Sequence, residues 1–75
     1  MTRGVFLSKF KLDSKTLVDA VEEKIDLEYD HPDLYQKVYQ FYKDRDVYFY
    51  DDKDKDYNII LESLEYDLLD SELLR

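Results

Sequence analysis

Residues 56–69, with the sequence DYNIILESLEYDLL, contain the clearest helical pattern in the chain. Apolar side chains recur there every three or four residues, the spacing that places them on one face of an α-helix. They are Tyr57, Ile60, Leu61, Leu64 and Leu68. Asp56 stands directly before this set and can accept a hydrogen bond from a free amide of the first turn. We therefore predict a last helix that Asp56 caps and that buries this face.

Two more helices are predicted before this segment. The first starts at Asp13 or Ser14, because either side chain can cap free amides, and its apolar stripe consists of Leu17, Val18, Val21 and Ile25. The second starts at Pro32, since the first helical position tolerates a missing N–H, and runs to about Lys43 with Leu34, Val38 and Phe41 on one stripe. The segments 26–31 and 51–56 are predicted to be loops.

Two segments have no decisive pattern. The N-terminal apolar residues, from Val5 to Leu12, fit a strand or a short helix equally well. Residues 46–50, DVYFY, favour a strand by composition, but a short helical turn or an extension of the preceding helix fits as well.

The chain contains one glycine and one proline, so it has few of the residues that tight hairpin turns prefer. We therefore predict an all-α fold, a small bundle of three to four short helices in a single domain spanning residues 1–75. The alternative is an α+β fold in which residues 47–50 and 57–62 pair as a hairpin with the N-terminal segment.

Charge is distributed unevenly along the chain. Residues 1–12 contain three basic residues and no acid, which leaves −11 on residues 13–75 against −8 for the whole chain. An acidic body repels nucleic acid and lipid headgroups and accelerates encounter with basic proteins. We expect a basic protein partner, with no direct nucleic-acid or membrane binding. Without cysteine and without a long apolar run, a cytoplasmic location is expected.

The residues offer little for catalysis. His31 is the one histidine and cysteine is absent, so nucleophilic triads and structural zinc sites lack parts. Asp52, Asp54 and Asp56 resemble the start of a calcium-binding EF-hand loop, but Tyr57 occupies the position that needs glycine and Ser63 the position that needs glutamate. We expect no enzyme activity, metal or cofactor.

Aspartate and aromatic residues occupy six of the seven positions from 46 to 52. Tyrosine is a frequent interface anchor because it buries a large rigid ring and keeps a polar tip. We predict that this cluster contacts the partner through Asp46, Tyr48, Phe49, Tyr50, Asp51 and Asp52, with Asp54 beside it. Alternatively, Val47 and Phe49 belong to the core and the tyrosines to its rim. Glu62 and Glu65, three residues apart, could imitate the spacing of backbone phosphates.

At this cluster the sequence resembles the immunity proteins that neutralise colicin- and pyocin-type nucleases. In that family two helices precede a very short third helix carrying Asp-Leu-Ile-Tyr-Tyr, an acidic loop and a last helix. Residues 46–50 look like the short helix, 51–56 like the loop and 57–69 like the last helix. The resemblance implies that Asp46, Phe49 and Tyr50 anchor a nuclease and that Glu28, Asp30 and Asp33 tune specificity.

This chain departs from the family pattern at several positions. The glycine and prolines around the tyrosine pair are missing, Phe49 replaces the first tyrosine, and the His-Pro pair precedes the second helix instead of the third. The function expected is an acidic inhibitor of a basic nucleic-acid-processing enzyme, either immunity-like or a nucleic-acid mimic of the phage anti-defence type. The alternative is a structural or regulatory subunit that forms a homodimer or docks on a larger assembly through Tyr66, Leu69, Leu73 and Leu74.

Overall fold

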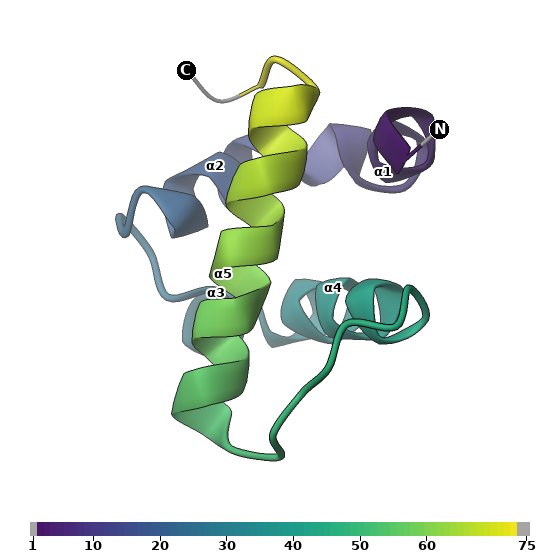
Figure 1. The fold of residues 1–75 in the computed structure, drawn as a ribbon. Helices are drawn as coiled ribbons and strands as arrows, with labels where there is room; N and C mark the ends of the chain where they lie inside the picture. Colours follow the sequence, from purple (N-terminus) through teal and green to yellow (C-terminus); the bar gives the residue numbers. More distant parts are fainter. Residues whose placement is uncertain (1, 74–75) are drawn as a thin grey trace.

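A computed structural model describes residues 2–73, and its regular elements are all helical (Figure 1). They are α1 (Thr2–Phe10), a 3-10 turn η1 (Lys11–Asp13), α2 (Ser14–Val21), α3 (Leu27–Asp30), α4 (Pro32–Lys43) and α5 (Lys53–Asp70). Four of these helices have eight or more residues, and α3 is a single turn. The predicted all-α bundle is confirmed. The hairpin alternative is wrong, because residues 57–62 lie inside α5 and no strand occurs between residues 2 and 73.

Helix α5 is the element on which the others pack. It contacts α1, α2 and α4, and in Figure 1 it runs in front of α2 and α3. Ile60, Leu64 and Leu68 are completely buried, as the apolar pattern predicts. The predicted start is wrong: α5 begins four residues earlier than the pattern suggests, because the side chain of Asp52 accepts a hydrogen bond of 3.1 Å from the amide of Lys55.

The N-terminal segment was expected to be a strand or a short helix, and the structure shows a helix. Phe6 and Phe10 lie one turn apart on α1, so both rings point into the core. Their ring centroids lie 6.0 and 5.2 Å from that of Phe41 on α4. This cluster of three phenylalanines attaches α1 to the bundle.

Helix α2 is shorter than its apolar stripe suggests. It ends at Val21, and Ile25 packs against the core from the turn that follows. Asp13 is the residue directly before α2, but its side chain makes no capping hydrogen bond. Glu23 takes a left-handed conformation, with a φ of 62°, where the chain leaves the helix.

The segment predicted as a loop at residues 26–31 contains α3. The side chain of Asp26 accepts a hydrogen bond of 2.9 Å from the amide of Tyr29, and Asp30 accepts one of 3.0 Å from the amide of Asp26. These reciprocal bonds satisfy two free amides at the start of the turn. They explain why so short a segment is helical and why Leu27 can be buried.

Helix α4 begins at Pro32 and ends at Lys43, as predicted. Tyr35, Val38, Phe41 and Tyr42 are its buried residues. None of the helices between residues 2 and 73 is long and apolar enough to cross a membrane.

Candidate protein-binding site

Residues 46–52, here called the tyrosine loop, connect α4 to α5 (Figure 1). Residues 47–50 form neither a strand nor a helix, so the very short helix that the immunity-protein resemblance implies there is absent. Asp46 and Asp51 take left-handed conformations, with φ of 65° and 59°, at either side of this segment. Aspartate adopts such a conformation more readily than most side chains.

Side chains of the tyrosine loop alternate between the core and the solvent. Val47 and Phe49 are partly buried and pack against the core, whereas Tyr48 and Tyr50 are 72% and 57% exposed. The rings of the two tyrosines contact each other edge to face, with centroids 4.9 Å apart. The loop therefore presents a pair of large aromatic side chains to the solvent.

Asp56 holds the loop backbone in place from the first turns of α5. Its carboxylate accepts hydrogen bonds of 2.7 Å from the amide of Tyr50 and 3.2 Å from the amide of Asp52. The residue is only 6% exposed. Since a buried carboxylate is costly unless it is hydrogen-bonded, these two bonds couple the position of the loop to the stability of α5.

Phe49 fixes the other side of the loop. Its ring stacks on that of Tyr39 from α4, with centroids 4.4 Å apart. The row of rings continues through Tyr35 to Tyr57, whose hydroxyl accepts a hydrogen bond of 2.8 Å from the amide of Leu27. The interpretation that Phe49 belongs to the core side of the cluster therefore fits the structure. Phe49 is partly buried, so only part of its ring is free for contact with a partner.

The predicted acidic residues divide among separate places. Glu28 of α3 joins Asp51 and Asp52 of the loop around one small hollow, which Tyr35 and Tyr39 also line. Asp46 and Asp54 are exposed but do not line this hollow. The structure thus brings Glu28, one of the three acids expected to tune specificity, to the tyrosine loop, although it lies 23 positions before Asp51.

The remaining predicted acids lie elsewhere. Asp30 and Asp33 line another hollow with His31 and Lys37, at the start of α4. Glu62 and Glu65 are exposed on α5. The candidate site with the best-defined geometry therefore consists of Tyr48, Tyr50, Asp51, Asp52 and Glu28.

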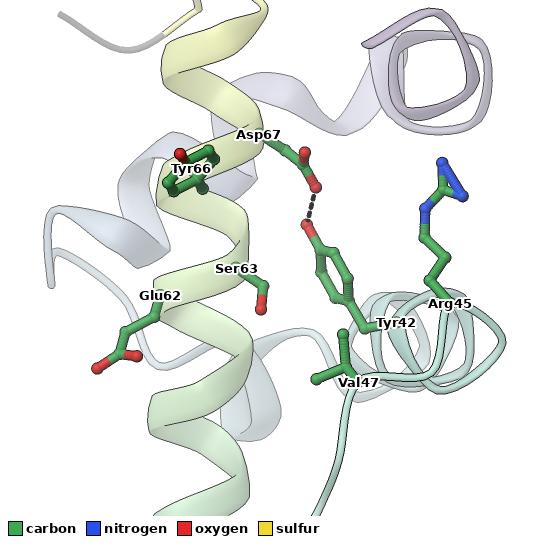
Figure 2. Close-up of a pocket in the computed structure, with 7 residues that line it drawn as sticks. All are labelled: Tyr42, Arg45, Val47, Glu62, Ser63, Tyr66 and Asp67. Carbon is green, nitrogen blue, oxygen red and sulfur yellow. Dashed lines mark hydrogen bonds between the residues drawn. The ribbon is translucent and has the colours of Figure 1, made fainter. Parts of the chain in front are cut away.

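A larger hollow, of about 570 Å³, lies between α4 and α5 and was not expected from the sequence. Figure 2 shows Tyr42, Arg45 and Val47 on one side and the α5 residues Glu62, Ser63, Tyr66 and Asp67 on the other. The hydroxyl of Tyr42 donates a hydrogen bond of 2.6 Å to Asp67. Burial and this hydrogen bond raise the pKa of Tyr42 well above its usual value. One sequence feature could have indicated this hollow: the polar residues Glu62, Ser63, Tyr66 and Asp67 share one side of α5.

Within residues 2–73, no group of three or more potential metal ligands is close enough to hold an ion. What the site offers is contact surface: exposed aromatic rings, carboxylates and a backbone held by hydrogen bonds. No protein-family model matches the chain, and searches of curated proteins and of solved structures also find no match.

Proposed function

We propose that this protein is a small acidic inhibitor that binds a basic nucleic-acid-processing enzyme through the tyrosine loop. One observation carries the proposal: Tyr48 and Tyr50 are exposed on a backbone that Asp56 holds with two hydrogen bonds. Exposed tyrosines are frequent hot spots of protein interfaces. A loop held in one conformation loses less entropy on binding.

The net charge of the chain and the acids near the loop support a basic partner. Glu28, Asp51 and Asp52 outnumber Lys53 around the hollow beside the loop, Lys55 lies over the ring of Tyr50, and the chain carries a net charge of −8. Enzymes that act on nucleic acids present basic surfaces to the phosphate backbone. An acidic protein is attracted to such a surface and orients on it before contact. A cytoplasmic setting, where such enzymes act, is part of this proposal.

The proposal can be tested by affinity capture with the purified full chain. Extracts of the source cells are passed over the wild-type protein and over a variant carrying Tyr48→Ala and Tyr50→Ala. We expect a basic protein to bind the wild type, to be lost from the double variant and to elute as salt screens the charges. The captured enzyme is then assayed on DNA and RNA with increasing amounts of the chain, which should inhibit it.

Tyr29→Ala is the matched control, because Tyr29 is an exposed tyrosine on α3. Its capture profile should equal that of the wild type. A captured protein that does not act on nucleic acid, or an enzyme that the chain binds without inhibiting, would contradict the proposed function.

The two forms of the inhibitor differ in how they block the enzyme. A nucleic-acid mimic occupies the substrate groove, so excess inert DNA or RNA should displace it. An inhibitor that binds outside the groove should stay bound when nucleic acid is added, and this result would favour the immunity-like form. The same captured enzyme distinguishes the two.

The alternative function, docking through the last helix, also has an observation in its favour. Tyr66 and Leu69 are exposed three residues apart on α5 and Leu73 is partly exposed after the helix ends, whereas Leu74 lies outside the described residues. The partner of this surface need not be the partner of the tyrosine loop.

A further inference from the structure

Helix α5 has an outer face in addition to the face it buries. Ile60, Leu64 and Leu68 point into the core, whereas Tyr66 and Leu69 are 79% and 50% exposed. Residues three and four positions apart share one side of a helix, so Tyr66, Leu69 and Glu62 lie together on the side opposite the core. We call this surface the α5 outer face.

Tyr66 stands between two depressions in this surface. On one side it lines the 570 Å³ hollow with Arg45, Val47 and Glu62 (Figure 2). On the other side it lines a smaller depression of about 300 Å³ with Leu69 and Asp70. The ring therefore has open space on both sides in which another molecule's side chains could pack.

The borders of these depressions are mainly acidic. Glu62, Asp67 and Asp70 contribute three carboxylates, and Arg45 is the one cation in the two linings. The guanidinium of Arg45 lies 4.6 Å from the ring centroid of Phe41, so it already has an aromatic contact within the chain. An apolar strip with acidic borders is complementary to an apolar strip with basic borders.

A second copy of this chain fits the surface poorly. Pairing two α5 outer faces would bring Glu62 and Asp70 of one copy toward the same residues of the other, and like charges at an interface are unfavourable. A basic occupant gains from the same carboxylates.

We infer that the α5 outer face binds a basic amphipathic helix of a partner protein. Apolar residues of that helix pack beside Tyr66 and Leu69, and its lysine or arginine side chains reach Glu62 and Asp70. This is the helix-in-groove mode of recognition, in which residues at spacings of three and four act as anchors. Its contacts do not include the exposed rings of Tyr48 and Tyr50, although Val47 of the tyrosine loop lines the same hollow, and it holds whether or not those rings bind an enzyme.

The test is a titration of the isotopically labelled full chain, followed by NMR, with a synthetic probe peptide. The probe has about 15 residues of lysine and leucine, with leucine at helical spacing. A second peptide replaces every lysine by glutamate. We expect the lysine peptide to shift the amides of α5 residues 62–70 and of Arg45 and Val47, and the glutamate peptide to leave them in place.

Two sets of variants identify the contacts. Tyr66→Ala with Leu69→Ala should weaken binding of the lysine peptide by about tenfold or more, because these side chains provide the exposed apolar contact. Tyr29→Ala, an exposed tyrosine on α3, should leave binding unchanged. Glu62→Lys with Asp70→Lys should exchange the preference, so that the glutamate peptide binds more tightly than the lysine peptide. That gain of binding cannot result from unfolding.

Three results would overturn the inference. Shifts spread equally over the acidic residues of α3 and the tyrosine loop would mean charge attraction without a defined site. Equal binding of both peptides would mean that the carboxylates do not discriminate between a basic and an acidic peptide. A mass that doubles with concentration in sedimentation, and that Tyr66→Ala with Leu69→Ala returns to the monomer, would assign the face to a second copy.

Discussion

Aspartate plays several structural roles in the segment that leads into α5. Asp46 and Asp51 adopt left-handed backbone conformations. Asp52 caps the helix, whereas Asp56 is buried and accepts hydrogen bonds from two loop amides. Asp54, between the last two, is exposed in the first turn. At this scale the position of the carboxylate relative to the backbone decides its role, because charge and size are the same in all five.

Replacing Asp56 should destabilise the protein and free the loop. Asp56→Ala removes both acceptors and leaves the amides of Tyr50 and Asp52 without this partner, so we expect a loss of about 2–3 kcal/mol in the free energy of unfolding. Asp56→Asn keeps one acceptor oxygen and should lose less. Urea unfolding followed by circular dichroism measures both. Asp54→Ala, two residues away and exposed, should change stability by less than about 1 kcal/mol. Equal losses at the two positions would disprove the role of Asp56.

The buried tyrosines predict a loss of stability at alkaline pH. Burial raises the pKa of Tyr35 to about 12 and raises the pKa of Tyr42 and Tyr57 as well. In the unfolded chain a tyrosine loses its proton near pH 10. Above that pH the unfolded state binds fewer protons than the folded state, so stability present below pH 10 decreases as the pH rises.

Phenolate absorbance and circular dichroism, recorded on the same samples between pH 9 and pH 13, test this pH dependence. The buried phenols should ionise together with the loss of helical signal. Tyr42→Phe should remove the contribution of Tyr42 to the alkaline decline. Complete ionisation of all eight tyrosines while the helices remain intact would contradict it.

At the scale of elements, long periodic segments were predictable and short ones were not. The buried face of α5 and both ends of α4 follow from apolar spacing and from Pro32. The start of α5 does not, because Asp52, Asp54 and Asp56 are equivalent as local capping signals. In the structure Asp52 caps the helix, and Asp56 instead accepts hydrogen bonds from the amides of Tyr50 and Asp52, because the loop folds back on the first turn of α5.

Helix α3 and the set of residues at the candidate site were also only partly predictable from the sequence. Four residues are too few for a periodic pattern, although the reciprocal pair Asp26 and Asp30 was a signal that could have been used. The exposed tyrosines were predicted as contacts from their chemistry, and the structure shows them exposed. That Glu28 lies beside Asp51, while Asp33 does not, depends on how α3 and α4 pack and cannot be read from the order of residues.

The phenylalanine cluster that attaches α1 leads to a prediction at this scale. Phe10 is buried against Phe6 and Phe41, and replacing such a ring by alanine typically costs about 3–5 kcal/mol. A domain of this size has only a few kcal/mol of stability. We therefore expect Phe10→Ala to be largely unfolded by circular dichroism at 25 °C. Leu12→Ala, at a leucine that is almost fully exposed, should melt like the wild type; matching melting curves for both variants would disprove the attachment.

At the scale of the whole molecule, charge repulsion opposes folding. The chain carries −8, and the ion pairs found among the described side chains are Lys15 with Asp19 and Lys24 with Glu22. Such exposed pairs contribute little. Exposed carboxylates such as those of Glu62 and Glu65 are therefore available to a partner, and the excess of like charge is repulsive when no partner is bound.

Added salt should therefore stabilise the free protein. Raising sodium chloride from about 0.01 M to about 0.5 M shortens the screening length severalfold, and we expect the urea midpoint to increase. Glu65→Lys, at an exposed position of α5, changes the net charge from −8 to −6 and should make the midpoint less sensitive to salt. A midpoint that falls with salt in both proteins would show that attractive pairs outweigh the repulsion.

The contact between α1 and α5 has a consequence for how the protein is made. The ribosome produces Phe6 and Phe10 first and Ile60, Leu64 and Leu68 near the end of the described chain, yet all five belong to one core. Translation must therefore pass α5 before the core can close. A message truncated within α5 would yield a polypeptide with exposed phenylalanines, the kind of product that chaperones and proteases recognise.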